Sequence, residues 1–175
     1  MAFKIFDQEP SWLDNDGDLD LYSQEMLSGT EFIEYTFKMT SKNKPDDFLE
    51  CGGMTLISDK ILNVINKYKD IKAIFHPVTM LWNGVKYYDS SFYFLEVVEE
   101  LKCVNYKESR YKFFPFTNRI MSLYKLVTYP IDTEKHKLFI IEDTCFLCID
   151  DHIGDELIYQ GCTGFNLIET SEAVI

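Results

Sequence analysis

The sequence predicts an α+β fold: a single domain with a mixed, mostly antiparallel sheet and at least two helices. The chain has 175 residues, a length typical of one domain, and no repeat or linker divides residues 1–175. Hydrophobic residues make up 46% of it and aromatic residues 15%, which favours a folded chain rich in strands. Ser58 and Asp150 each precede apolar residues at helical spacing, so each is expected to cap a helix.

The N-terminal part combines strand patterns with an acidic segment. Phe3 to Phe6 is expected to form a strand, and Glu31 to Met39 alternates apolar and polar residues as a half-buried strand does. Between them four aspartates surround a glycine: Asp14, Asp16, Asp18 and Asp20. An EF-hand loop with its glycine at Gly17 would need a ligand at Trp12, so we expect a solvated acidic turn that could face a basic partner.

The next segment predicts a loop followed by a helix. Ser41 to Asp47 is polar and is expected to be exposed, and Cys51-Gly52-Gly53 interrupts the chain again. A helix should then run from its cap at Ser58 through Lys69. Its apolar stripe would consist of Ile61, Leu62, Ile65 and Tyr68, and Lys67 and Lys69 would suit its C-terminal end.

The middle of the chain predicts further strands. Ile71 to Tyr88 should form two strands joined by a turn at Asn83-Gly84, a strong hairpin signal. Ser91 to Val98 and Ile120 to Val127 are apolar at nearly every position, which is typical of central strands. Lys107 to Lys112 is expected to be a charged connection between them.

The C-terminal segment has the clearest local pattern. Leu138 to Ile141 and Thr144 to Ile149 are expected to pair as a hairpin around Glu142 and Asp143, the first strand being covered on both faces. A helix should follow, capped by Asp150, with Asp151 and Asp155 in or near its first turn and Ile153, Leu157 and Ile158 on one face. Gly161 should end that helix, and Gly164 to Ile168 should form a last strand.

The net charge of −12, with a pI near 4.6, limits the partners. It disfavours nucleic acid and anionic membranes, and it would accelerate capture of a basic protein. The acidity is equally compatible with a role in solubility alone. The N-terminus lacks the apolar run of a signal peptide, and no stretch reaches the ~18 apolar residues of a membrane span, so a cytoplasmic protein is expected.

The candidates for chemistry are weak. Cys145 and Cys148 form a single CxxC, but their spacing within a strand would place the two thiols on opposite faces, so we expect free core cysteines. His76, His136 and His152 are far apart, and none is paired with a carboxylate or cysteine at metal-ligand spacing. We therefore expect no catalytic residue, metal or cofactor. A small enzyme that uses Cys145 or Cys148 with a histidine stays open as an alternative.

Several segments, in their order, resemble the immunity-protein family of bacterial polymorphic toxin systems. They are PDDFL (45–49), ISDKILNVI (57–65), FYFLEVVEELKCVNYKES (92–109), KLFIIEDTCFLCIDD (137–151) and QGCTGF (160–165). The resemblance spans roughly residues 45–169, and residues 1–44 match poorly. A serine usually opens the last helix in the family, where this chain has Asp150.

The resemblance implies a binder and not an enzyme. Family members are encoded beside a toxin and neutralise it, which implies stoichiometric occlusion of a cognate toxin protein, and the acidity of this chain leads us to expect that the toxin is basic. Five aromatic residues are candidate anchors for such a partner, with burial in the core as their alternative: Tyr87, Tyr88, Phe113, Phe114 and Phe116. A regulatory scaffold is a further alternative.

Overall fold

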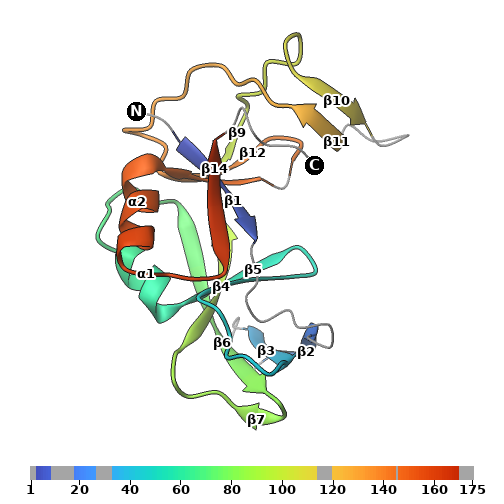
Figure 1. The fold of residues 1–175 in the computed structure, drawn as a ribbon, viewed down its shortest axis with the longest axis vertical. Coiled ribbons are helices and arrows are strands. Elements are labelled where there is room, and N and C mark those ends of the chain that lie inside the picture. The colour runs from blue at the N-terminus through green and yellow to red at the C-terminus, as the bar shows by residue number, and fades with distance from the viewer. Residues whose placement is uncertain (1–2, 9–17, 27–32, 114–119, 145, 170–175) are drawn as a thin grey trace.

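The computed structural model describes residues 3–8, 18–26, 33–113, 120–144 and 146–169. Strands predominate in these residues, and two helices lie together on one side of the molecule (Figure 1). The expected α+β class, with mixed sheets and at least two helices, is thus confirmed. The expectation of one sheet is wrong, because the described strands form three.

The largest sheet has seven strands. Along the sheet their order is β2 (Asp18–Met26), β3 (Ile33–Thr40), β6 (Ala73–Trp82), β8 (Phe92–Val97), β5 (Met54–Ser58) and β4 (Phe48–Cys51), with β7 (Val85–Lys86) paired to β6. Only β3 and β6 run parallel; the other pairs are antiparallel. The sheet curls until its edge strands meet, since the Cys51 Sγ lies 3.3 Å from the Leu19 carbonyl oxygen.

The second sheet has five strands drawn from both ends of the chain. Their order is β14 (Phe165–Glu169), β1 (Phe3–Gln8), β13 (Leu147–Asp150), β12 (Leu138–Ile141) and β9 (Glu100–Leu101). β9 is parallel to β12, and the other neighbours are antiparallel. The predicted strands at Phe3 to Phe6, Leu138 to Ile141 and Gly164 to Ile168 are confirmed.

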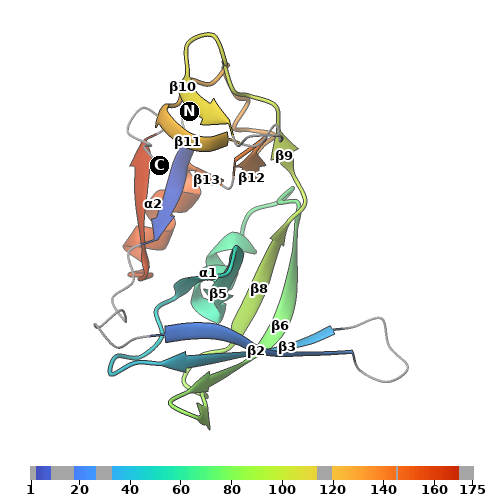
Figure 2. The ribbon, with the colours of Figure 1, turned by 90° about the vertical axis from the view of Figure 1, so that its right-hand side faces the viewer.

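A two-stranded sheet, β10 (Arg110–Phe113) with β11 (Ile120–Lys125), lies at the opposite end of the molecule from β2 and β3 (Figure 2). Ile120 to Val127 therefore contains a strand, but that strand is not central. The predicted charged connection at Lys107 to Lys112 overlaps the start of β10. Its charged residues are tolerated because β10 is an outlying strand with an exposed face.

Three apolar clusters hold these elements together. The first lies between the two larger sheets and the helices, with Phe48, Leu95, Leu147, Ile153 and Phe165 among its buried members. The second covers the other face of the five-stranded sheet, and the third fills the concave side of the curled seven-stranded sheet. Because the first cluster contains residues of both larger sheets, it holds these two sheets together.

The two helices follow their predicted caps. Ser58 accepts from the Ile61 amide at the start of α1 (Asp59–Ile65), and Asp150 accepts from the His152 amide at 3.1 Å at the start of α2 (Asp151–Tyr159). α1 is shorter than expected, so Lys67 and Lys69 lie beyond it. Ile158 is exposed, because it lies five residues after Ile153, and five helical steps turn it about 140° away from that residue.

Other predictions were confirmed in part. Asn83 and Gly84 have positive φ and close the β6–β7 hairpin, and β8 lies in the interior of its sheet. The expected acidic turn is wrong for Asp18 and Asp20, which lie in β2 and pair with β3; Asp14 and Asp16 are outside the described residues. The interruption at Gly52-Gly53 is a hairpin turn between β4 and β5, two strands that the sequence pattern had not predicted.

Candidate functional site

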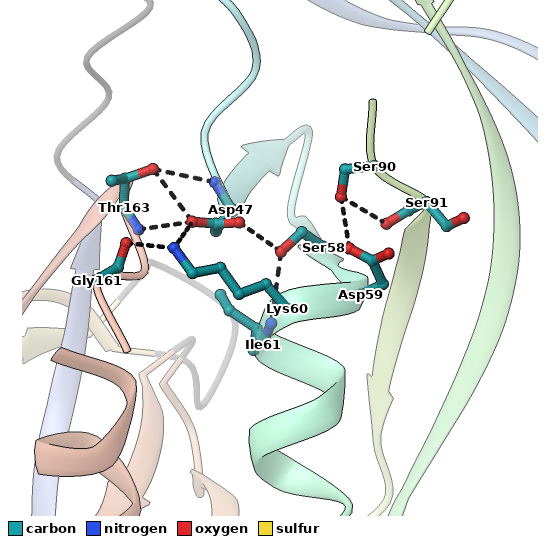
Figure 3. Close-up of polar contacts among 9 residues, drawn as sticks. All are labelled: Asp47, Ser58, Asp59, Lys60, Ile61, Ser90, Ser91, Gly161 and Thr163. Carbon is teal, nitrogen blue, oxygen red and sulfur yellow. Dashed lines mark hydrogen bonds and ion pairs between the residues drawn. The ribbon is translucent and has the colours of Figure 1, made fainter. Parts of the chain in front are cut away.

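Three of the segments that carry the family resemblance meet at one polar junction (Figure 3). It joins the loop before β4, the first turn of α1 and the loop between α2 and β14. The Asp47 carboxylate lies at its centre. Backbone bonds reinforce it, since the Phe48 amide donates to the Thr163 carbonyl at 3.0 Å and the Ser58 amide donates to the Asp47 carbonyl at 2.8 Å.

The Asp47 side chain accepts from donors on both other segments. The Ser58 hydroxyl donates to it at 2.6 Å and the Thr163 amide at 3.0 Å, and Lys60 Nζ lies 3.4 Å away. Lys60 also donates to the Gly161 carbonyl at 2.5 Å, while Ser58 Oγ is fully buried. These donors and acceptors satisfy one another, so the junction is a structural clamp and not an exposed reactive centre.

Close packing adds to the clamp at Gly164. This residue has φ +95°, and a Cβ there would collide with the Phe48 carbonyl oxygen and the Asp46 side chain. Gly164 must therefore be a glycine, because it lies where the QGCTGF segment packs against the PDDFL segment. At the start of α1, the Ser90 hydroxyl donates a further hydrogen bond to the Asp59 carboxylate at 2.7 Å (Figure 3).

Tyr87 and Tyr88, two predicted partner anchors, follow β7. Tyr87 is half-buried, with its ring 5.9 Å from Trp82 and 6.2 Å from Phe92, and burial raises the pKa of its hydroxyl. Tyr88 is 78% exposed, with Lys86 Nζ 5.8 Å from its ring centre. Both line a pocket of about 270 Å³. Tyr87 thus packs in the core, and Tyr88 is the one available to a partner.

The acidic candidates Asp18 and Asp20 lie at the same end of the same sheet. Asp20 pairs with Lys38, Lys38 with Leu81, and Leu81 with Lys86, so one row of the ladder connects β2 to the β7 hairpin. Both aspartates are exposed. The row contains Asp20, Lys38 and Lys86, so this part of the surface is mixed in charge and not uniformly acidic.

Phe113 lies at the other end of the molecule, in β10 (Figure 1). Its ring is 4.9 Å from Tyr111 and 6.3 Å from Tyr106, and it is 40% exposed. Phe114 and Phe116 fall outside the described residues. The structure therefore does not bring Phe113 together with Tyr87 and Tyr88 in one aromatic patch.

The described cysteines are free thiols: Cys51, Cys103, Cys148 and Cys162. Cys148 is fully buried in β13, and burial raises the pKa of its thiol well above the ordinary value. Burial also raises the thiol pKa of Cys103 to about 11. The prediction of a core cysteine is confirmed for Cys148, whereas Cys145 lies outside the described residues.

The histidines differ from expectation, because two of them lie beside carboxylates from distant parts of the chain. His76 Nε2 is 2.7 Å from Glu96, across the β6–β8 pair, and His136 Nδ1 is 3.2 Å from Glu99. His152 is exposed. Within the described residues no three metal-binding side chains gather in one place.

Sequence reasoning missed a cleft of about 410 Å³ between the two larger sheets. The β4–β5 hairpin forms one side with Glu50, Gly53 and Thr55, β8 forms the floor, and the β12–β13 hairpin forms the other side with Ile140, Thr144 and Leu147. The one sequence signal was Glu50, an isolated acid in the short apolar segment FLEC.

A protein-family model described as an immunity protein family (Imm11) matches residues 4–171. The expected family resemblance is thereby confirmed. The match extends beyond the predicted span of 45–169 and includes most of residues 1–44, for which a poor match was expected. No curated protein matches the chain. The two described helices, of seven and nine residues, are too short to cross a bilayer.

Proposed function

The chain belongs to the Imm11 immunity protein family, and from this we propose that it binds and neutralises the cognate toxin of a bacterial polymorphic toxin system. The observation that carries the proposal is the extent of the match, which covers residues 4–171 of 175. The match includes both larger sheets and both helices, so the family assignment applies to the fold as a whole.

The mechanism we propose is stoichiometric occlusion, in which no covalent bond is made or broken. The chemistry of the described residues supports it. A nucleophilic cysteine needs a stabilised thiolate, whereas burial raises the thiol pKa of Cys103, Cys148 and Cys162. The His76 and His136 rings lie against carboxylates rather than against a thiol.

The partner we propose is a basic toxin domain, met in the cytoplasm of the cell that makes both proteins. The formal charge of −12 supports this choice, because a negative field raises the association rate of a positively charged protein. Protection also requires slow dissociation, which buried contacts supply better than surface charge.

We propose that two of the predicted surface features contact the toxin. Tyr88 presents an exposed aromatic ring at the β7 end of the seven-stranded sheet, and Asp18 and Asp20 lie along the same end on β2. An exposed tyrosine beside a pocket suits a hot-spot contact, and the aspartates suit a charged rim.

Co-expression tests the function directly. The toxin domain encoded next to this gene is induced alone, with this protein, or with an unrelated acidic protein of similar size. We expect growth only with this protein, and a 1:1 complex on size-exclusion chromatography. Toxicity that persists with equal expression of both proteins, and no complex by isothermal titration, would rule the proposal out.

A further inference from the structure

The cleft between the two larger sheets combines apolar walls with a carboxylate. Its volume is about 410 Å³, and Leu95, Val97, Ile140 and Leu147 supply much of its lining. The β4–β5–β8 register places Glu50, Thr55 and Leu95 in one row on the face that packs toward β12 and β13. Glu50 therefore belongs to the cleft side of its strand.

Glu50 has no cationic partner within the described residues, whereas Glu96, which lines the same cleft, pairs with His76. Among the described residues, Lys or His side chains pair with Glu96, Glu99, Glu142 and Glu156, but none of these ion pairs involves Glu50. The Glu50 side chain is exposed to solvent on the cleft side of β4, but the groups around it partly desolvate its carboxylate, and this desolvation together with the negative charge of Asp7 on β1 raises its pKa. If a partner covered this carboxylate, its position beside apolar groups and another acid would be unfavourable unless the partner supplied a positive charge.

We propose that this cleft receives an arginine or lysine side chain of the toxin, with its aliphatic part against Leu95, Val97, Ile140 and Leu147 and its charged end at Glu50. The inference rests on the proposed function and adds the contact surface and the chemistry of the partner. Long basic side chains have an apolar stem and a cationic tip, and the cleft offers surfaces for both.

Other occupants suit the site less well. An anionic ligand would meet the charges of Glu50, Asp7 and Glu96, and a purely apolar side chain would leave the Glu50 carboxylate without a partner and further from water. A cation removes the repulsion between Glu50 and Asp7. The energetic gain therefore arises only in the complex, where it lowers the dissociation rate.

The test uses three purified variants with the neighbouring toxin domain. Glu50→Gln removes the charge, and Thr55→Phe fills the cleft from a strand position that favours aromatic residues. Glu108→Gln is the matched control, because it removes an equal charge from an exposed loop away from the cleft. Circular dichroism and thermal melting establish that each variant is folded before binding is measured.

We expect Glu50→Gln and Thr55→Phe each to weaken the toxin Kd at least tenfold, mainly through faster dissociation. Glu108→Gln should change the Kd less than threefold, and this change should arise from a slower association rate. Glu50→Gln should melt at the wild-type temperature or slightly above it, because an unfavourable charge is lost. Equal affinity of the wild type and Glu50→Gln would overturn the inference while leaving the proposed function intact.

A small-molecule arm decides the inference even if the wild type fails to bind the toxin, a result that would refute the proposed function alone. N-acetylarginine methylamide is titrated at millimolar concentration against labelled protein, and N-acetylcitrulline methylamide serves as its neutral isostere. The arginine probe should shift the amide signals of Gly53, Thr55 and Thr144 in the wild type and not in Glu50→Gln. No shift, or the same shift with the citrulline probe, would overturn the inference.

Discussion

Replacing Asp47 by alanine tests whether the polar junction holds the two larger sheets together. The change leaves the fully buried Ser58 hydroxyl without its 2.6 Å acceptor and removes the acceptor of the Thr163 amide at 3.0 Å. Lys60 contributes little, because its Nζ lies 3.4 Å away and its side chain is 42% exposed. Losing a charged acceptor from one buried and one partly hydrated donor costs roughly 2–3 kcal/mol.

The assay is urea unfolding followed by circular dichroism, with thermal melting beside it. For a chain of 175 residues, a loss of that size lowers the melting temperature by roughly 4–12 °C. The slope of the urea transition should stay at the wild-type value, because the surface exposed on unfolding is unchanged. The melting temperature of Asp47→Asn should lie between those of the wild type and Asp47→Ala, since the asparagine amide oxygen can still accept from Ser58.

The control is Asp89→Ala. Asp89 pairs with Lys44 at 2.5 Å, but both side chains are more than half exposed, and such pairs add little to stability. Its melting temperature should match the wild type. If Asp47→Ala and Asp89→Ala melt at the same temperature, the junction is not a structural clamp and the reasoning fails.

Three further predictions concern surface binding, acid stability and thiol reactivity. Tyr88→Ala should weaken toxin binding at least tenfold without altering the melting temperature, and equal binding by Tyr88→Ala and the wild type would exclude Tyr88 as an anchor. Tyr87→Ala should instead lower the melting temperature, because it removes contacts with the third core cluster. Burial opposes ionisation of the Glu99 carboxyl, but hydrogen bonds and charge interactions with Lys72 and His136 outweigh burial and lower the pKa of Glu99. The ionised Glu99 therefore stabilises the fold at pH values above the ordinary pKa of 4.5, and this stabilisation is lost as the pH falls through the pKa of the folded state. Glu99→Gln should therefore flatten the decline of urea stability below about pH 4.5, and an unchanged decline would contradict this assignment. Cys103 and Cys148 should react with a thiol reagent at pH 8 only in denaturant; rapid labelling of either in the native protein would favour the enzyme alternative.

Local signals in the sequence located most elements. The caps at Ser58 and Asp150, the turn at Asn83-Gly84 and the apolar run of β12 each depend on residues within a few positions, so one sequence suffices to find them. Strand pairing, in contrast, depends on residues that are far apart in the chain. β1 lies between β13 and β14, more than 140 residues away in the chain, and no pattern within Phe3–Gln8 specifies those neighbours.

The sites were harder to predict for the same reason. The junction joins Asp47, Ser58 and Thr163, and the cleft joins Glu50 to Leu147. Each residue taken alone reads as a loop, cap or strand residue, and its role appears only when the two sheets pack. The aromatic candidates fail as a group because aromatic content does not distinguish a core ring such as Tyr87 from an exposed ring such as Tyr88.

The junction and the cleft belong to one hairpin, and this arrangement would make the proposed binding surface rigid before the toxin arrives. Asp47 fixes the base of the β4–β5 hairpin to α1 and to the start of β14, while the other end of that hairpin, at Gly53, forms part of the cleft wall. A wall fixed at its base loses little conformational entropy when a partner binds, so more of the contact energy appears as affinity. Glu50 is exposed on this wall in the free protein, so its charge becomes unfavourable only when a partner covers it, and a cation from the partner would then offset that cost.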